Sequence, residues 1–469
     1  MVILKLEKLK TTILILLVLV SIVLTTRIWL DISIEGIFIM PKDNVIKEEK
    51  KDVEFDSLAF IKPEKMIINN NGKHTLLFND SEKGALYNRI LEEGMAFLGN
   101  LFSSKESMSY DILPIENLNK IRQGSNVEII LPFSFDVDIL ASILGFDKTD
   151  WIDIKGVDSI IMSFDSNLHY ILDKKEGSLY EFNPIDLKSN MKFLLDMINK
   201  FETYSYVFLN ELDSEKFSDD VFIPAYSSSF KLPRVSVTSE IQDKDLKDIA
   251  ASFLNIEAGS LRSIVEPNGT VIYSDGSEKG MKINKDGLIE YVSYTSGIIL
   301  KKSILSINDL VDIATGFIED HLGFPYDTYI SSIEKTDNDG CIIKYNYRYE
   351  GLPIINDNLG LKDLVEIEIA EGKVKKYKRL IRHIKETGEL KDIKNPLSII
   401  DILYKRLHDK NMNLDEIKIM DAYLAYMEFD TEKDIFMLPV WVLDVITYEG
   451  NRGKYIMNAE TGVILSEPY

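Results

Sequence analysis

Hydrophobic and polar residues are distributed unevenly along the chain, and the longest uncharged stretch lies near its N-terminus. Residues 11–26 read TTILILLVLVSIVLTT, and the apolar pattern continues past Arg27 to Leu30. A helix of about 20 residues, at roughly 1.5 Å per residue, crosses a hydrocarbon core of about 30 Å. The long side chain of Arg27 and the indole of Trp29 suit the headgroup region. The pattern predicts a transmembrane helix at residues 11–30.

The residues around this helix predict its orientation. Lys5, Lys8 and Lys10 precede it against Glu7 alone, and positively charged residues stay on the cytoplasmic side. Residues 1–10 are then a cytoplasmic tail, and the bulk of the chain is extracytoplasmic. A cleaved signal peptide would share the basic start and the apolar centre. The following sequence, TTRIWLDIS, has no small-x-small cleavage site, which favours an uncleaved, single-pass anchor in the cell membrane.

The rest of the pattern predicts an α+β fold that begins after a charged linker at residues 31–54. Apolar residues recur at helical spacing in two segments of the next part of the chain, with strand-like segments between them. The predicted helices are residues 81–98 and 187–201, and the predicted strands are residues 127–131, 159–164, 169–173 and 178–182. We therefore expect an N-terminal extracytoplasmic α+β domain at residues 55–235. The order of its strands does not follow from the sequence.

The C-terminal half contains an internal repeat whose units each begin with an amphipathic helix. The helices begin near Asp243, after Ser306 and after Asn395. Serine and asparagine are favoured at helix N-caps, and Pro396 suits the first helical position. Strand-like segments follow each helix. Each unit is therefore predicted to be one helix laid across a curved antiparallel sheet, with domains at residues 236–390 and 391–469.

A hairpin with a glycine in its turn ends each predicted unit. The three glycines are Gly287, Gly372 and Gly462, and each can adopt a positive φ without steric strain. From cap to glycine the second unit spans 66 residues (306 to 372) and the third spans 67 (395 to 462). The first spans 44 (243 to 287) and is interpreted as a partial copy.

Proline-containing strands are predicted midway through the last two units. They are YRYEGLPII at residues 347–355 and DIFMLPVWVLDV at residues 434–445. The nearly equal spacing and the shared strand favour a true duplication over coincidence.

The amino-acid composition excludes several kinds of partner and one kind of fold. The chain has 76 acidic and 54 basic residues and a formal net charge of −22, which argues against nucleic acid or an anionic polymer as a partner bound through bulk charge. A single cysteine excludes an intrachain disulfide framework. With 45% hydrophobic residues, the chain can build cores by packing alone.

No catalytic motif or metal-ligand spacing stands out. Asp136 and Asp138 would share one face of a strand, as an acid/base or metal pair can, but 76 acidic residues make such a coincidence expected. Residues 337–340 (DNDG) do not place their glycine where an EF-hand requires it, so a strand turn is favoured. We expect no catalytic residue, no cofactor and no metal site.

Three further positions are interpreted structurally. His321 is expected in the last turn of its helix, where the helix dipole favours it, rather than as a ligand. Cys341 is expected in the core. The sequence Asn268-Gly269-Thr270 fits a glycosylation sequon, but its PNGT context favours a hairpin turn.

The chain resembles the YycH family over essentially its whole length, and more weakly the related YycI family. The resemblance rests on the end of the anchor, SIVLTTRIWLDIS, on YEGLPI at residues 349–354, and on LPVWVLDV and GKYIMNAETGVIL within residues 438–465. The length is similar to YycH rather than to the shorter YycI. The resemblance implies YycI-like folds for residues 236–390 and 391–469, and the hairpins alone also resemble PepSY-type domains.

The resemblance implies a regulator of the WalK (YycG) sensor histidine kinase. It implies association with the kinase and with a YycI-type protein, adjustment of cell-wall homeostasis signalling, and no catalytic residues. Contact in the membrane is expected through the anchor, whose small polar residues favour helix packing. The candidates are Thr11, Thr12, Ser21, Thr25 and Thr26. The alternative, that lipid simply tolerates these residues, stays open.

Two other functions remain possible at this point. One is a PepSY-like inhibitor or chaperone of an exported peptidase. The other is a protein that binds a cell-wall polymer or hydrolyses it, although the absence of a catalytic pattern argues against hydrolysis.

Overall fold

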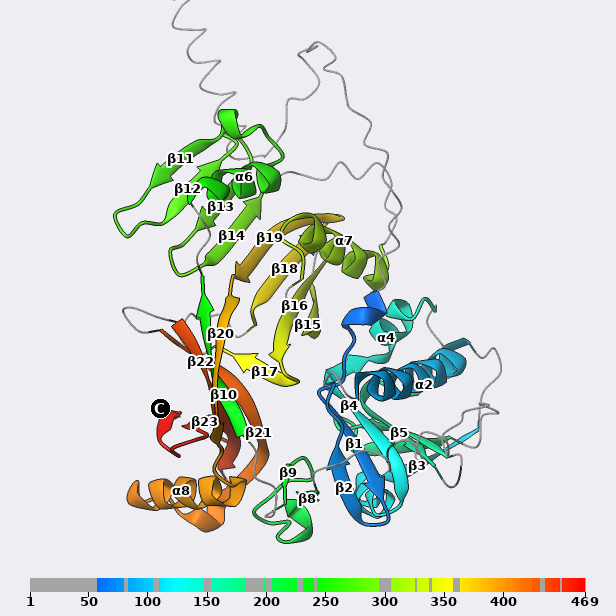
Figure 1. Cartoon of the computed structure of the whole chain (residues 1–469). Helices are drawn as coiled ribbons and strands as arrows, with labels where there is room; N and C mark the ends of the chain where they lie inside the picture. Colours follow the sequence, from blue (N-terminus) through cyan, green and yellow to red (C-terminus); the bar gives the residue numbers. More distant parts are fainter. Residues whose placement is uncertain are drawn as a thin grey trace, which may run out of the picture. The chain divides into compact units, whose positions relative to one another are not determined.

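The computed structural model describes residues 57–79, 83–103, 109–146, 153–164, 166, 168–182, 198, 205–225, 231–239, 243–294, 305–324, 327–336, 340–356, 363–430, 435–447 and 449–468. All of these residues belong to one compact unit, Phe55–Tyr469 (Figure 1). The predicted anchor at 11–30 and linker at 31–54 lie outside them. Among the residues described, no helix is long and apolar enough to cross a bilayer.

The N-terminal module is built on an antiparallel sheet. Within the described residues this sheet has nine strands in the order β3-β7-β6-β5-β4-β1-β2-β8-β9. The strands are β1 (Lys65–Asn70), β2 (Lys73–Leu76), β3 (Tyr110–Pro114), β4 (Ser125–Asp136), β5 (Gly156–Ser163), β6 (His169–Asp173), β7 (Ser178–Phe182), β8 (Tyr206–Phe208) and β9 (Phe222–Pro224). The four strands predicted from the sequence are confirmed as parts of β4, β5, β6 and β7.

Helix α2 (Gly84–Ser103) packs on one face of this sheet and confirms the helix predicted for residues 81–98. Gly94 allows α2 to pack closely on the sheet, because a β-carbon there would lie 2.6 Å from the Ile129 δ-methyl group of β4. The predicted helix at 187–201 lies outside the described residues except for Ile198, which is buried.

The placement of Asp136 and Asp138 on one face of a strand is wrong. Asp136 ends β4 and caps α4 (Val137–Ile143), where its carboxylate accepts the backbone N–H groups of Asp138 and Ile139. The two carboxyl groups therefore do not line one strand face. An aspartate that precedes an apolar run is a common helix cap, and this local role outweighed the alternating pattern.

The C-terminal part contains three units, each with one helix followed by an antiparallel meander. In the described residues the first unit is α6 (Asp243–Leu254) with β11 (Arg262–Val265), β12 (Val271–Ser274), β13 (Lys279–Ile283) and β14 (Leu288–Ser293). The second is α7 (Ile307–Asp320) with β15 (Asp327–Thr336), β16 (Gly340–Tyr349), β18 (Val365–Ala370) and β19 (Lys373–Leu380). The third is α8 (Pro396–Asp409) with β21 (Ile417–Asp430), β22 (Ile435–Thr447), β23 (Arg452–Asn458) and β24 (Ile464–Ser466).

The first unit was expected to be a partial copy, but it has the same succession of elements as the other two. It is shorter because its strands are short. In each unit the strands pair with their neighbours in sequence order.

Local sequence signals set the boundaries of these elements as predicted. Ser306 forms a reciprocal capping box with Asp309, and the Asn395 side chain accepts the N–H of Leu397. The hairpin glycines have positive φ values, which are +86° for Gly287, +69° for Gly372 and +78° for Gly462.

The segment 347–355 is not one strand, as the sequence had suggested. Glu350 and Gly351 both have positive φ and form a tight turn between β16 and β17 (Leu352–Ile355). β17 then pairs in parallel with β21, where Ile354 lies opposite Tyr426. The segment therefore connects the second unit to the third.

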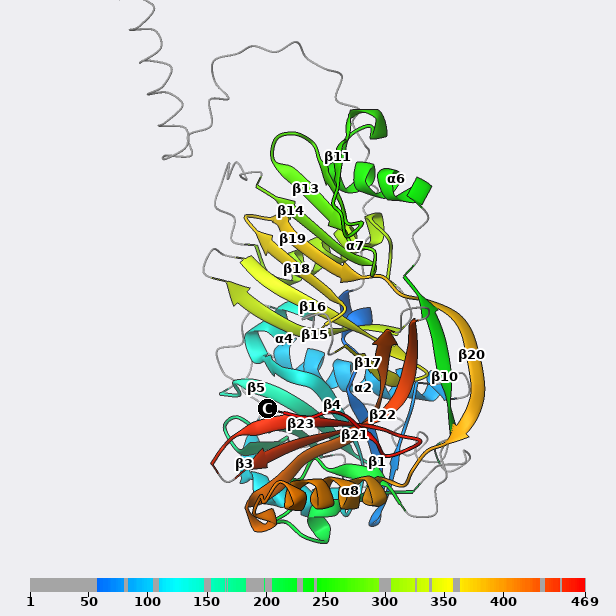
Figure 2. The same ribbon diagram turned by 90° about the vertical axis from the view of Figure 1, so that its left-hand side faces the viewer.

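The first two units share one continuous sheet, because β14 and β19 pair with each other. Tyr291 and Tyr377 lie opposite each other at this seam, and Phe253 of α6 and Phe317 of α7 pack there with ring centroids 5.7 Å apart. Both helices thus cover the same face, which can be followed in Figure 2.

A long ribbon joins the third unit to the rest of the sheet. β10 (Lys231–Thr238) pairs with β20 (His383–Asp392) and with β22. The larger sheet has 15 strands among the described residues. The predicted domain boundaries at 235/236 and 390/391 fall within this ribbon, and the division into 55–235, 236–390 and 391–469 stays a prediction.

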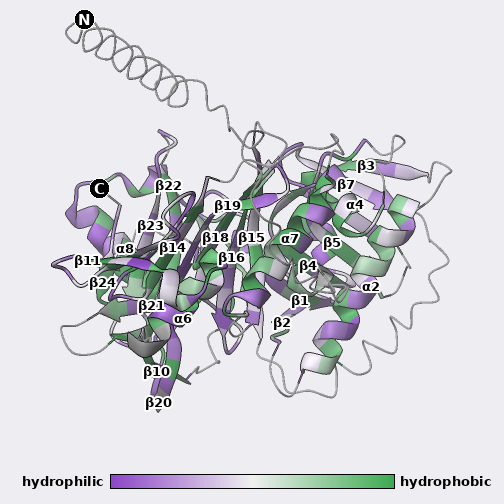
Figure 3. Cartoon of the chain, turned by 90° about the horizontal axis from the view of Figure 1, so that it is seen from above, coloured by the Kyte–Doolittle hydropathy of each residue, from purple (hydrophilic) through white to green (hydrophobic). Residues whose placement is uncertain are grey.

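The core follows this arrangement. One hydrophobic cluster extends from the N-terminal module through the first two units, and a second lies between α8 and the strands of the third unit. Figure 3 shows hydrophobic residues along the strands and on helix faces turned toward them.

Candidate functional site

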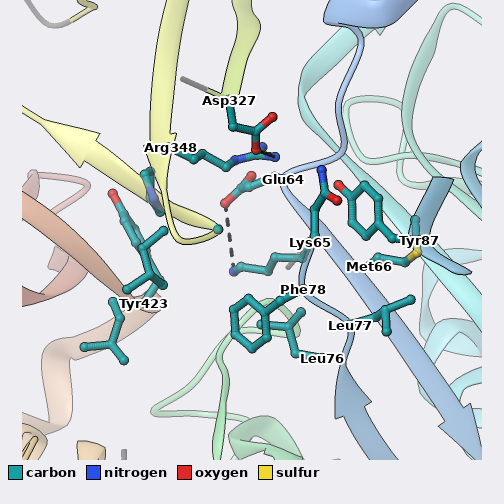
Figure 4. A pocket seen from close by; sticks show the side chains of 15 residues that line it. Glu64, Lys65, Met66, Leu76, Leu77, Phe78, Tyr87, Asp327, Arg348 and Tyr423 are labelled. Atoms are coloured by element: carbon teal, nitrogen blue, oxygen red, sulfur yellow. Dashed lines mark ion pairs between the residues drawn. The ribbon is translucent and has the colours of Figure 1, made fainter. Parts of the chain in front are cut away.

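Charged side chains gather where the start of β1 meets the second and third units (Figure 4). Lys62 Nζ lies 2.5 Å from Asp327 Oδ1 of β15, and Lys65 Nζ lies 2.8 Å from Asp421 Oδ1 of β21. We call this region the junction. These two ion pairs link lysines of the N-terminal module to carboxylates of the second and third units, so the junction joins three parts of the fold.

Arg348 of β16 completes the junction from the opposite direction. Its Nη2 donates to the Pro63 carbonyl oxygen at 2.8 Å, and its guanidinium lies over the Tyr329 ring with its carbon 4.2 Å from the ring centroid. The side chain is buried, and its nearest carboxylate, Asp327, is 4.0 Å away. The arginine therefore fixes the backbone that enters β1.

Burial and neighbouring carboxylates shift the pKa of Lys65 in opposite directions. Burial alone would lower the pKa of its ammonium group, but the carboxylates of Asp421 and Glu64 outweigh burial and raise the pKa above its usual value. Glu64 lies 4.0 Å from the same nitrogen (dashed line in Figure 4). The Lys65 ammonium group therefore carries its charge at neutral pH.

A small cavity of about 80 Å³ lies within the junction, lined by charged and apolar side chains. Binding sites for metabolites usually have volumes of about 300–1,000 Å³. The cavity has room for a few water molecules only. The junction is therefore suited to holding the parts of the fold together, rather than to binding a small molecule.

The N-terminal module also contacts the third unit through its backbone. The Ser218 N–H donates to the Ile419 carbonyl oxygen at 3.0 Å, and the Ile419 N–H donates to the Lys216 carbonyl oxygen at 2.9 Å. The loop between β8 and β9 thereby forms a short parallel bridge to β21. Together with the junction, this bridge gives the module two separate attachments.

Two open grooves on the third unit are larger. One, of about 430 Å³, lies on the sheet face away from α8 and is lined by Tyr423, Val442 and Ile456, with the ion pair of Asp444 and Arg452 at its side. The other, of about 570 Å³, lies between α8 and β24. Their shape suits protein side chains rather than a buried ligand.

The structure places the remaining sequence-predicted positions as follows. His321 lies at the C-cap of α7, where its Nδ1 is 2.7 Å from the Phe317 carbonyl oxygen, which confirms the structural interpretation. Cys341 is fully buried, and burial raises the pKa of its thiol to about 12. The Asn268 side chain accepts the Thr270 N–H, as expected for a turn.

Other predicted positions lie outside the described residues. They are residues 337–339 of the DNDG turn and the anchor positions Thr11, Thr12, Ser21, Thr25 and Thr26. Within the part of the chain that the structure describes, no three His, Cys, Asp or Glu side chains are arranged to hold a metal ion.

Sequence reasoning missed the junction entirely. The sequence around each junction residue is charged or mixed, which is typical of solvent-exposed surface. Nothing in this pattern indicates that Lys62, Lys65 and Asp421 lie close together. A lysine at the start of a strongly apolar strand, as in KMII, was the only local signal.

Two family descriptions match the sequence. "YycH protein, C-terminal domain" matches residues 218–455, and "YycH protein, N-terminal domain" matches residues 7–179. A search of curated proteins found no match.

Among solved structures, the chain is similar to YycH from Bacillus subtilis, with a TM-score of 0.53 and 13% identity over 88% of this chain and 97% of that one. At this identity the likeness shows the fold. An uncharacterized protein from Eubacterium rectale ATCC 33656 gives a TM-score of 0.35 and 15% identity, covering 51% of this chain and 85% of that one.

Proposed function

Because the chain belongs to the YycH family, we propose that it regulates a WalK (YycG)-type sensor histidine kinase through protein contact. The family matches over both halves of the chain are the observation that carries this proposal. The family is one of regulatory proteins rather than enzymes, and membership supports a role in the WalK system.

Regulation by contact requires that the protein binds two states of the kinase with different affinity. A coupling free energy of about 1–3 kcal/mol changes an equilibrium constant by roughly 5- to 150-fold. The junction supports this role, because ion pairs and a backbone bridge link the N-terminal module to the second and third units.

We place the membrane contact in the anchor at residues 11–30, with the kinase and a YycI-type protein as partners. Ser21 and Thr25 are four residues apart and would share one helix face, as close helix packing in lipid requires. Thr11, Thr12 and Thr26 extend the set of candidates. The body of the protein would then act outside the membrane, with residues 1–10 in the cytoplasm.

Crosslinking in native membranes, followed by identification of the captured proteins, tests the partners. The proposal expects a sensor histidine kinase and a YycI-type protein. Recovery of an exported peptidase instead, or retention of the purified chain on peptidoglycan, would favour the inhibitor or wall-binding alternative and overturn the proposal.

Replacement of residues 11–30 by an unrelated membrane-spanning helix tests the anchor separately. Kinase output should change while the rest of the chain keeps its thermal unfolding profile. A double replacement of Ser21 and Thr25 by leucine is the finer variant. Unchanged kinase output after the full exchange would refute contact through the anchor.

A further inference from the structure

The free edge of the first repeat unit is an extended strand with exposed branched side chains. β11 ends the larger sheet and, in the described part of the chain, pairs only with β12. All of its residues are exposed, with Ile264 at 67% and Val265 at 69%. Figures 1 and 2 both show it at the outer margin of the sheet. The unpaired backbone groups of a sheet edge are a template for another strand.

The adjoining hairpin determines which backbone groups of β11 point outward. The Glu266 N–H donates to the Thr270 carbonyl oxygen at 2.8 Å, so the backbone of Glu266 faces β12. Along an antiparallel strand, every second residue faces the same neighbour. The N–H and C=O groups of Ser263 and Val265 therefore point to the free edge.

Two copies of β11 can pair in only a few antiparallel registers. In each of them Ser263 or Val265, whose backbone groups point to the free edge, must lie opposite Ser263 or Val265 of the second copy. In one register Ser263 lies opposite Val265 of the second copy, and Ile264 lies opposite its own counterpart. The same register sets Arg262 opposite Glu266 on both sides of the two-fold axis. Sliding the strands by two residues either way sets Arg262 or Glu266 opposite Ile264 and loses both charge pairs.

The side chains in this register complement one another. Neither Arg262 nor Glu266 forms an ion pair with another described residue. Both lie in positions that do not exchange hydrogen bonds with the second copy, where opposite Cα atoms approach to about 4.5 Å. Ile264 lies beside Ile272 of β12, so that pairing would place four isoleucine side chains in one row.

We propose that this protein self-associates by antiparallel addition of β11 to β11 of a second copy, in the register centred on Ile264. The contact is small, with about four backbone hydrogen bonds. Two copies attached to one membrane surface meet at a much higher effective concentration than free copies do. The self-association goes beyond the proposed kinase regulation and needs no other protein.

Disulfide trapping tests the register in the full-length protein reconstituted in lipid vesicles without any partner. Ile264→Cys should form a disulfide-linked dimer under mild oxidation, because opposite residues lie within the 4.4–6.8 Å typical of disulfides. Ser263→Cys is the matched control, since its counterpart is Val265 rather than itself. The native Cys341 is fully buried and contributes little background. Equal dimer yields from the two variants would overturn the register.

Charge exchange tests the pairing independently. Arg262→Glu and Glu266→Arg each create like charges across the axis, and each alone should lower the yield of dimer about tenfold. Mixing the two variants restores both opposite-charge pairs and should restore the dimer, as should the double variant R262E/E266R. The yield of the Ile264→Cys disulfide in the same vesicles measures the dimer in each variant background, and far-UV circular dichroism verifies folding. Failure of the mixture to associate, with both variants folded, would refute the proposal.

Discussion

Arg382 forms a two-pronged ion pair with Glu428, and both side chains are only 7% exposed. A third nitrogen of the same guanidinium donates to the Asp286 carbonyl oxygen. Arg382 lies between β19 and β20, Glu428 in β21 and Asp286 in the β13–β14 turn. One buried arginine thus connects all three repeat units. Such a pair fixes geometry more than it adds net stability, because desolvation offsets most of the attraction.

Replacement of Arg382 by alanine should leave Glu428 buried and unpaired. We expect the free energy of unfolding to fall by about 3–5 kcal/mol. The double variant R382M/E428L should recover most of that loss, because no charge is then left buried. Urea denaturation measures both changes. Arg406→Ala, which removes a solvent-exposed ion pair with Glu467, is the control and should change stability far less. Equal effects of the two single variants would contradict the argument.

Gly287 should not tolerate a side chain. Its φ is +86°, and a β-carbon would lie 2.9 Å from the Ile381 carbonyl oxygen and 3.0 Å from Arg382 Nη1. Gly450 has nearly the same φ, +84°, and open space around it. Gly450→Ala should cost about 1–2 kcal/mol from backbone strain alone, and Gly287→Ala should cost clearly more. Thermal unfolding of the two variants measures the difference, and equal losses would show that the close contact is unimportant.

Replacement of Lys65 in the junction should destabilise the protein more than replacement of an exposed lysine. Lys65→Met removes the partner of Asp421 from a half-buried site and should destabilise the protein by about 1–3 kcal/mol. Lys155→Met, at an exposed ion pair with Glu176, is the matched control and should cost little. Because the pKa of Lys65 is raised above 10.5, its contribution to stability is complete below pH 10.5 and lost only at higher pH. Urea unfolding at pH 7 and pH 9 should therefore give the same difference between the two variants.

The C-terminal strand β24 should be held less firmly to the third unit at acid pH. Hydrogen bonds from Arg406 and Lys410 lower the pKa of Glu467 from 4.5 to about 2. A lowered folded-state pKa stabilises the fold above pH 4.5, and this stabilisation is lost as the pH falls toward 2. The protection factors of the β24 amides, which are corrected for the intrinsic pH dependence of exchange, should therefore fall over that range. Glu467→Gln should have lower protection factors already at neutral pH, with no further fall toward pH 2; a variant that kept this fall would contradict the assignment.

Cys341 should be unreactive in the folded protein. The thiol is fully buried, and its pKa is raised to about 12, so little thiolate forms at pH 8. Labelling with a maleimide reagent should follow unfolding and become rapid in urea. Rapid labelling without denaturant would show that β16 opens locally.

The sequence predicted the elements whose signals are local. The caps at Ser306 and Asn395, the hairpin glycines and the strands from β4 to β7 follow from residue type and short-range spacing. The turn at Glu350 and Gly351 was misread because apolar residues continue on both sides of it. The first unit was predicted to be a partial copy because its short strands reduce the spacing between its helix and its hairpin glycine, although all of its elements are present.

Contacts between distant segments could not be predicted. Lys65 and Asp421 are 356 residues apart, and each is one of many charged residues whose usual place is the surface. The buried pair of Arg122 and Glu128 is close in sequence, yet its burial depends on Phe208, over which the guanidinium lies with its carbon 4.3 Å from the ring centroid. Pairing of this kind depends on tertiary packing rather than on spacing.

The ribbon of β10 and β20 affects the order in which the chain can fold during synthesis. β10 (Lys231–Thr238) is made early, yet it pairs with β22 (Ile435–Thr447), which is close to the C-terminus. A nascent chain therefore carries β10 without a partner until β20 (His383–Asp392) is made about 145 residues later, and with one edge unpaired until β22 follows. Completion of the third unit must be a late event, and truncation anywhere before β22 should yield an aggregation-prone product rather than a smaller folded protein.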